Sequence, residues 1–124
     1  MSKPDKRRVK DLLSNWRHWS RDFPPDSAEI LYYTISPMFR DYVKPTPKSI
    51  RYDEESAWMV ERVMQEMFEW KPKEREMLIL YWLYIPHQAD LADALGVSER
   101  TIRRRMGYAH DTFAHHWGLL FLED

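Results

Sequence analysis

Residues 88–109 read QADLADALGVSERTIRRRMGYA and decide the fold of this 124-residue chain. The stretch predicts a helix over Gln88–Leu95, a tight turn, and a second helix that begins near Glu99. Gly96 stands where a helix C-terminus favours a left-handed residue, a conformation that glycine adopts without steric strain. Ser98 suits the N-cap, because its hydroxyl accepts from an otherwise unpaired backbone N–H. The pattern is that of a helix-turn-helix.

The second helix of this pair separates an apolar face from a basic face. Apolar residues repeat at helical spacing and are expected to face inward: Ile102, Met106 and Ala109. Arginines fall on the other faces with few acidic neighbours, whereas a solvated helix usually interleaves charges of both signs. Uncompensated arginines beside a helix N-terminus suit phosphates and guanine edges. The alternative is an ordinary helical hairpin whose arginines form a solvated face.

The residues predicted to contact DNA are Gln88, Ser98, Glu99, Arg100, Thr101, Arg103 and Arg104. Arg100 and Arg104 lie one turn apart on the face opposite Ile102, so they are the best candidates for base edges. Arg103 is better placed for a phosphate, and Gln88 is positioned to donate to a phosphate at the start of the first helix.

The composition favours an all-α fold: a small helical domain with a C-terminal helix-turn-helix and a long recognition helix. Only three residues are glycine, and the hydrophobic content of 44% excludes a wholly disordered chain. The absence of cysteine excludes a disulfide framework and a thiolate metal site. No apolar run reaches membrane-spanning length and no signal peptide is evident, which favours a cytoplasmic protein.

The net charge is −1, but the charges are segregated along the chain. The N-terminal stretch is basic, the middle is acidic, and the second helix of the pair is basic again. Two explanations remain open at this point: the patches serve more than one partner, or they neutralise one another within the fold.

Three further helices are predicted from apolar periodicity, over residues 6–21, 53–70 and 73–84. The first is expected to bury Val9, Leu12, Leu13, Trp16 and Trp19 or Ser20. The second is expected to begin with Asp53 as N-cap and to bury Ala57, Val60, Val63, Met64, Met67 and Phe68. The third is expected to present Met77, Leu78, Tyr81 and Trp82 as its apolar side. The last helix is expected to continue through Phe113 to about Trp117.

The segment between the first two of these helices is rich in proline and aromatic residues. Residues 26–43 predict a short helix to about residue 35, and their tyrosines and Phe39 either pack on the domain or form a contact surface. Residues 44–48, KPTPK, resemble a linker. The chain is therefore divided into an N-terminal helix with a proline-rich arm, 1–48, and a helical domain, 49–124.

Three stretches together resemble the phage antitermination protein Q family, in the group without zinc-binding cysteines. They are LLSNWRHWSR at residues 12–21, ISPMF at 35–39 with the acidic-capped helix that follows, and ADLADALGVSERTIRRRMGYAH at 89–110. The last is also similar to the DNA-binding module of sigma-factor region 4 and of response-regulator output domains. The resemblance implies a phage late-gene regulator that binds double-stranded DNA near a promoter, engages paused RNA polymerase and makes it ignore terminators.

The leading hypothesis is therefore a sequence-specific DNA-binding regulator, most specifically a phage late-gene antiterminator. The alternatives are a protein-interaction module, suggested by Tyr32, Tyr33, Phe39 and Trp58, and a plain helix-turn-helix activator or repressor. An enzyme and a cofactor are not expected. His110, His115 and His116 are spaced so that they do not share one helical face, so a zinc site is not expected either.

Overall fold

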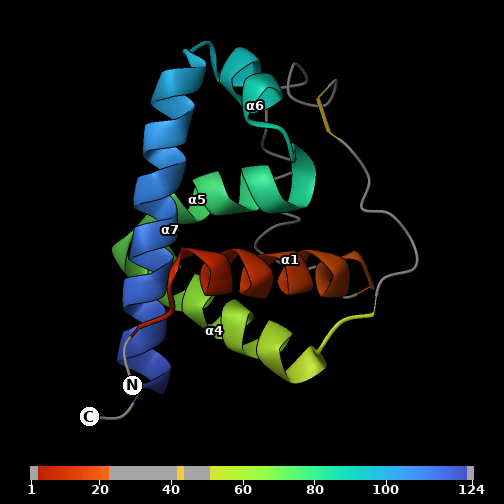
Figure 1. Ribbon diagram of the computed structural model, residues 1–124, viewed down its shortest axis with the longest axis vertical. Helices are drawn as coiled ribbons and strands as arrows, with labels where there is room; N and C mark the ends of the chain where they lie inside the picture. Colours follow the sequence, from red (N-terminus) through yellow and green to blue (C-terminus); the bar gives the residue numbers. More distant parts are fainter. Residues whose placement is uncertain (1–2, 23–41, 44–50, 123–124) are drawn as a thin grey trace.

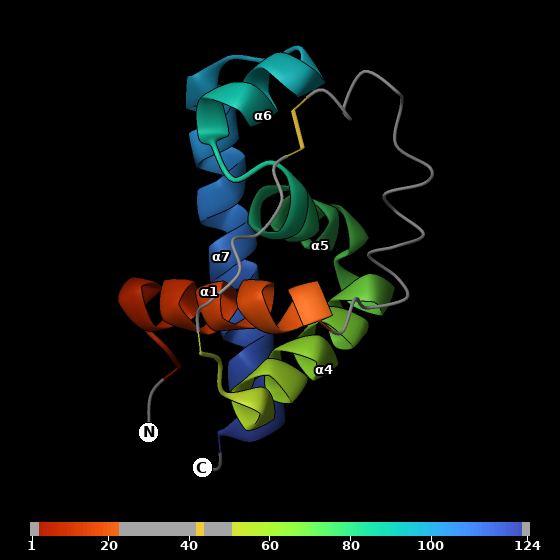
Figure 2. The same ribbon diagram turned by 90° about the vertical axis from the view of Figure 1, so that its right-hand side faces the viewer.

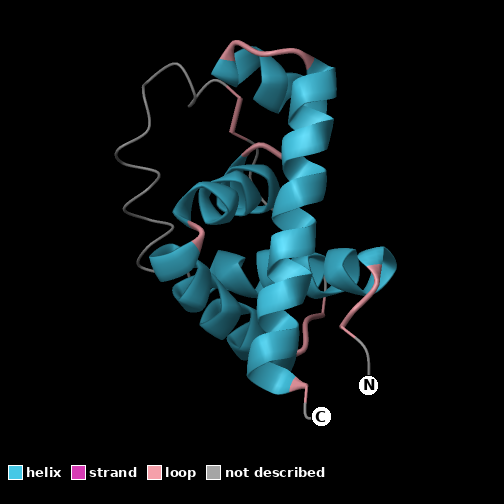
Figure 3. Cartoon of the chain, turned by 90° about the vertical axis from the view of Figure 1, so that its left-hand side faces the viewer, coloured by secondary structure: helices cyan, strands magenta, loops and turns pink. Residues whose placement is uncertain are grey.

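The structure, a computed structural model, describes residues 3–22, 42–43 and 51–122, and all of its regular elements are helical (Figures 1 and 3). The all-α prediction is confirmed. In chain order the elements are α1 (Lys6–Asp22), α4 (Glu54–Trp70), α5 (Pro72–Ile79), the π-helical turn η1 (Leu80–Tyr84), α6 (Gln88–Leu95) and α7 (Glu99–Phe121).

Helix α7 runs along the long axis of the molecule, and the other helices are arranged along its length (Figure 1). Helix α6 lies beside its first turns, while α5, α1 and α4 cross it further along (Figures 1 and 2). One continuous hydrophobic cluster receives side chains from α1, α4, α5, α6 and α7. This order leaves the start of α7 at one end of the molecule, away from the crossing of α1 with α4.

Helix α1 packs on α4 through the apolar stripe that the sequence predicts. The buried residues of α1 are Val9, Leu12, Leu13, Trp16, Trp19 and Ser20. The indole Nε1 of Trp16 donates to Glu61 Oε1 at 2.9 Å inside the core. Asn15 forms a reciprocal pair with the backbone of Asp53, donating to its carbonyl at 2.8 Å and accepting from its N–H at 2.6 Å. These polar contacts fix where α1 lies along α4.

Helix α4 confirms most of its predicted stripe but not the last residue. Ala57, Val60, Val63, Met64 and Met67 are buried, whereas Phe68 is 64% exposed, so its predicted burial is wrong. The ring of Phe68 lies under the Arg75 guanidinium, 5.1 Å from its carbon to the ring centroid. The last buried residue of α4 is Met67, so Phe68 lies in a final turn that extends past the core. Asp53 occupies the N-cap position, but its carboxylate accepts from the Ser56 hydroxyl and not from a backbone N–H.

The segment from α5 into η1 departs from the predicted single α-helix. After Ile79 the chain widens into a π-helical turn that ends where the Ile85 N–H donates to the Leu80 carbonyl, five residues back. Three consecutive residues of this segment are buried, namely Leu78, Ile79 and Leu80. Leu78 is buried as predicted, and Met77, Tyr81 and Trp82 pack against the core with only part of their surface buried. The reason is that α5 and η1 have neighbours on several sides, namely α1, α4, α6 and α7, so burial does not follow one stripe.

Several sequence predictions lie outside the described residues. These are the short helix before residue 35, the aromatic residues Tyr32, Tyr33 and Phe39, the linker at 44–48 and thus the division at residue 48. Tyr42 is described, and its hydroxyl donates to the Asp93 carboxylate on α6. Among the described helices, none combines the length and the apolar character needed to cross a lipid bilayer.

Candidate nucleic-acid interface

The turn between α6 and α7 has the geometry that Gly96 was predicted to supply. Gly96 adopts φ 69° and ψ 33°, the left-handed conformation. Its N–H donates to the Asp93 carbonyl at 3.2 Å, and the Val97 N–H donates to the Ala92 carbonyl at 3.0 Å. This pair of bonds is a Schellman motif, which satisfies the last carbonyls of α6 and turns the chain sharply. We call residues 88–109 the α6–α7 unit.

Helix α7 begins at a hydroxyl cap that Ser98 and Thr101 build together. Ser98 Oγ accepts from the Thr101 N–H at 3.1 Å, as the N-cap prediction requires. The Thr101 side-chain Oγ1 lies 2.9 Å from the same Ser98 oxygen, so the two hydroxyls also share a hydrogen bond. The cap fixes the direction of α7 as it leaves the turn.

The inner face of α7 is buried as the periodicity predicts. The buried residues include Ile102, Met106, Ala109, Phe113 and Trp117. Helix α7 continues to Phe121, one turn beyond the predicted end near Trp117. The extra turn forms because Leu120 and Phe121 are partly buried against the core, and the Phe121 ring packs edge-on against Trp117 at 4.8 Å. The apolar tail is thus largely part of the helix.

The outer face of the first turns of α7 carries four exposed arginines: Arg100, Arg103, Arg104 and Arg105. None of them forms an ion pair with a residue that the structure describes. Glu99 is exposed in the first turn, where the helix dipole stabilises a carboxylate. Because the arginines are not neutralised by described carboxylates, their charge is available to an anionic partner. The lack of ion pairs with described residues favours the explanation that this patch serves a partner.

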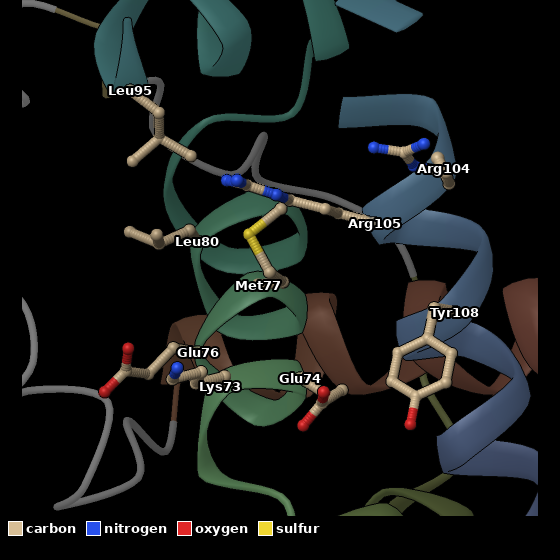
Figure 4. Close-up of a pocket in the computed structure, with 9 residues that line it drawn as sticks. All are labelled: Lys73, Glu74, Glu76, Met77, Leu80, Leu95, Arg104, Arg105 and Tyr108. Carbon is tan, nitrogen blue, oxygen red and sulfur yellow. The ribbon is translucent and has the colours of Figure 1, made fainter. Parts of the chain in front are cut away.

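A groove of about 700 Å³ runs between α5 and α7 on one side of the arginine row (Figure 4). We call it the α5–α7 groove; its lining residues are Lys73, Glu74, Glu76, Met77, Leu80, Leu95, Arg104, Arg105 and Tyr108. Figure 4 shows Arg105 reaching from α7 across the groove above Met77, while Arg104 lies at the groove's edge. Arg105 thus extends over the α5–α7 groove, whereas Arg100 and Arg103 are not among the residues that line it.

A smaller recess of about 160 Å³ lies on the other side of the row, where α1 meets the α6–α7 unit. We call it the α1–α7 recess; its lining residues are Lys6, Lys10, Gln88, Arg103, Met106, Gly107, His110 and Asp111. Thus the structure brings together Gln88 and Arg103, two residues predicted to contact phosphates. It adds Lys6 and Lys10, which sequence reasoning did not connect with the α6–α7 unit. Their spacing of one helical turn, off the buried stripe of α1, is visible in the sequence, but their place beside α7 is a property of the tertiary packing.

His110 lies at the inner wall of the α1–α7 recess as a neutral imidazole. Its Nε2 accepts from the Trp82 indole at 3.1 Å. The pKa of His110 is lowered from 6.5 to about 4, mainly by burial and in smaller part by the positive charge of Lys10, while Asp111 opposes the shift. His115 is exposed and His116 is buried, so the three histidines of α7 occupy different environments. The residues that the structure describes contain no group of three side chains suited to a metal ion.

The comparisons with known proteins give one family. A search of curated proteins and a search of solved structures each found no match. The model of the family described as "Phage antitermination protein Q" matches residues 6–120, which reach from the first turn of α1 almost to the end of α7. The match includes the whole α6–α7 unit, its arginines and both sides of the α1–α7 recess. The chain belongs to the phage antitermination protein Q family.

Proposed function

We propose that this protein binds double-stranded DNA through the α6–α7 unit, acting as a helix-turn-helix, and that it is a phage late-gene antiterminator acting on RNA polymerase. The single observation that supports the DNA part most strongly is the row of exposed arginines at the capped start of α7, none of them paired with a described carboxylate. Membership of the antitermination family supports the transcriptional part. The proposed activity is binding, without a catalytic step or a cofactor.

In this proposal the first turns of α7 enter the major groove. Arg100 and Arg104 have the reach and the donor geometry to contact guanine edges, while Arg103 and Gln88 contact the flanking backbone. Ser98 and Thr101 position the helix through their shared cap and lie close enough to its start to contact a phosphate. Glu99 is placed to accept from a cytosine amino group. In helix-turn-helix proteins the second helix docks in the major groove in this way.

The DNA hypothesis is tested by selecting duplexes from a randomised library with the purified protein. Arg100→Ala and Arg104→Ala are then each expected to cost about 1–3 kcal/mol on the selected duplex and to lose discrimination against a scrambled one. The readout is a binding titration by gel shift or anisotropy on both duplexes. Arg62→Ala on α4 is the matched control, because this exposed arginine belongs to another face and packs over the Phe121 ring. Failure to enrich any sequence, or equal affinities for all variants, would overturn the assignment.

A protein-interaction role without DNA binding is the second candidate, and one observation favours it. Helix α4 exposes three large aromatic side chains, with Trp58, Phe68 and Trp70 each more than half accessible. Large exposed aromatic side chains are enriched at protein contacts. Capture of RNA polymerase that is insensitive to salt, with no retention of DNA, would favour this candidate. A steep salt dependence of DNA binding favours the first.

Antitermination itself is separated from simple activation or repression by a readthrough assay. Purified polymerase transcribes a template with a promoter, the selected DNA site and a terminator. The antiterminator hypothesis predicts more readthrough with the protein than without it, and a loss of this effect in Arg100→Ala. Unchanged readthrough combined with altered initiation would assign the protein as an activator or repressor.

A further inference from the structure

The α1–α7 recess collects positive charge from two helices that lie far apart in the sequence. Lys6 and Lys10 come from the first two turns of α1, and Arg103 comes from the second turn of α7. The two lysines are exposed, and so is the arginine. None of the three forms an ion pair with a described residue. Asp111 is the single carboxylate among the residues that line the recess, so the recess has a net positive charge.

The uncharged wall of the recess also suits an anion. Gln88 is the first residue of α6, where backbone N–H groups and the helix dipole favour negative charge. His110 accepts a hydrogen bond from the Trp82 indole, and burial keeps its pKa low, so the cations of the recess are Lys6, Lys10 and Arg103. The exposed Gly107 carries no side chain that would close the recess from the α7 side.

The position of the recess relative to the arginine row matters for the identity of the anion. Arg103 lies one residue from Arg104 in the row, and helical geometry turns successive side chains by about 100°. Arg103 therefore points sideways from the row, toward α1, when Arg100 and Arg104 point outward. A duplex whose major groove receives Arg100 and Arg104 has a backbone that passes along this side. The anion closest at hand is thus a backbone phosphate.

We propose that α1 is part of the DNA interface, with Lys6 and Lys10 joining Arg103 and Gln88 to hold a backbone phosphate in the α1–α7 recess. This inference depends on the DNA binding proposed above and adds a second element to it. Because the contact is made to phosphate, it supplies affinity and orientation and contributes no sequence information. Helix α1 then packs against the core with one face and contacts the bound DNA through Lys6 and Lys10.

The test compares Lys6→Ala/Lys10→Ala with the unchanged chain in a salt series on a selected and a scrambled duplex. The variant is expected to bind both duplexes about tenfold more weakly, with the ratio between them preserved. The slope of log affinity against log salt is expected to become shallower by about 1 for each phosphate that the variant no longer neutralises. Both side chains are exposed, so helicity by circular dichroism is expected to stay the same.

Arg21→Ala is the matched control on the same helix. Arg21 is an exposed cation in the last turn of α1, about 22 Å along the helix axis from Lys6. It is expected to leave both the affinity and the salt slope unchanged. Lys6→Arg/Lys10→Arg is expected to restore the slope, because a guanidinium holds phosphate as well as an ammonium does.

Duplexes with single neutral methylphosphonate linkages locate the contact on the DNA. One or two adjacent linkages beside the selected site are expected to weaken the unchanged chain but not Lys6→Ala/Lys10→Ala. An unchanged salt slope in the lysine variant, or a loss confined to the selected duplex, would overturn the inference while leaving the Arg100 and Arg104 assignment standing. Failure of the proposed DNA binding is recognised separately, because Arg100→Ala would then also be without effect.

Discussion

At the scale of single residues, the hydrogen bond between Trp16 and Glu61 satisfies a carboxylate inside the core. Both side chains are buried, and the indole donates to the carboxylate across the junction of α1 and α4. The Arg75 side chain is also buried, and its Nε donates to the Met64 carbonyl at 3.0 Å. Burial lowers the pKa of Arg75, while the negative charge of Glu61 raises it and so favours the charged guanidinium. A buried carboxylate with such partners is stable only while the partners remain.

Trp16→Phe is therefore expected to lower the free energy of unfolding by about 1–3 kcal/mol, because a buried carboxylate loses a hydrogen-bond donor. Denaturant unfolding followed by circular dichroism measures the change. Trp58→Phe is the matched control on α4, since this tryptophan is 56% exposed and its loss is expected to cost less than about 0.5 kcal/mol. Similar losses in the two variants would show that the Trp16 hydrogen bond contributes little.

At the scale of elements, the Gly96 turn decides the angle between α6 and α7. Its φ of 69° lies where a side chain strains the backbone, although no atom beyond its own chain neighbours lies within 4 Å of the position that a Cβ would take. Gly107, by contrast, lies inside α7 with equally open surroundings and an ordinary helical backbone. The two glycines thus differ in backbone conformation and not in available space.

Alanine at the two glycines is expected to change stability in opposite directions. Gly96→Ala is expected to destabilise by about 1–2 kcal/mol, the cost of a left-handed residue with a Cβ. Gly107→Ala is expected to stabilise by about 0.5–1 kcal/mol, because alanine loses less backbone entropy in a helix. Thermal or denaturant unfolding of the pair checks both signs. Destabilisation by Gly107→Ala would indicate that the helix does not tolerate a side chain there.

The elements also show what the sequence can and cannot reveal. The inner stripes of α1 and α7 were predictable, because each helix buries one face and the apolar residues repeat at helical spacing. Phe68 was mispredicted because the periodic pattern does not say where the core ends. Leu80 was missed because a π-helical turn changes the residue spacing and several neighbours surround it.

The same distinction holds for the candidate interface. The turn, the cap and the outward arginines follow from local rules, and the sequence therefore predicted where they stand. The α1–α7 recess did not follow, because it joins Lys6 to residues almost a hundred positions later. The packing of α1 against α7 brings these residues together, and the local sequence pattern does not predict that packing.

At the scale of the whole molecule, buried histidines make stability depend on pH. The pKa of His110 is about 4 in the folded protein, mainly because of burial, against 6.5 in a solvated chain. Burial also lowers the pKa of His18 and of His116. Between pH 6.5 and 4 the unfolded chain takes up a proton at His110 that the folded protein does not, so stability falls as the pH falls.

The free energy of unfolding is accordingly expected to be greatest above pH 6.5 and to decrease on acidification, by up to about 3 kcal/mol from His110 alone. Urea unfolding from neutral pH down to about pH 5 measures the slope, in a range where histidines dominate over carboxylates. His110→Gln, which keeps an acceptor for Trp82, is expected to flatten the curve. His115→Gln removes an exposed imidazole and serves as the control. Equal slopes in the two variants would contradict the assignment to His110.

The uninterrupted length of α7 has a mechanical consequence. Its 23 residues form a rod of about 35 Å, with the arginine row at one end and, at the other, Phe121 in contact with Arg62 of α4. No hinge separates the two ends, so the face of α4 that exposes Trp58 keeps a fixed direction about the axis of the duplex that the proposed DNA binding places on α7. A partner protein bound to that face of α4 would therefore lie on one side of the DNA. Moving the DNA-binding site by half a helical turn along the template would place that partner on the opposite side of the DNA.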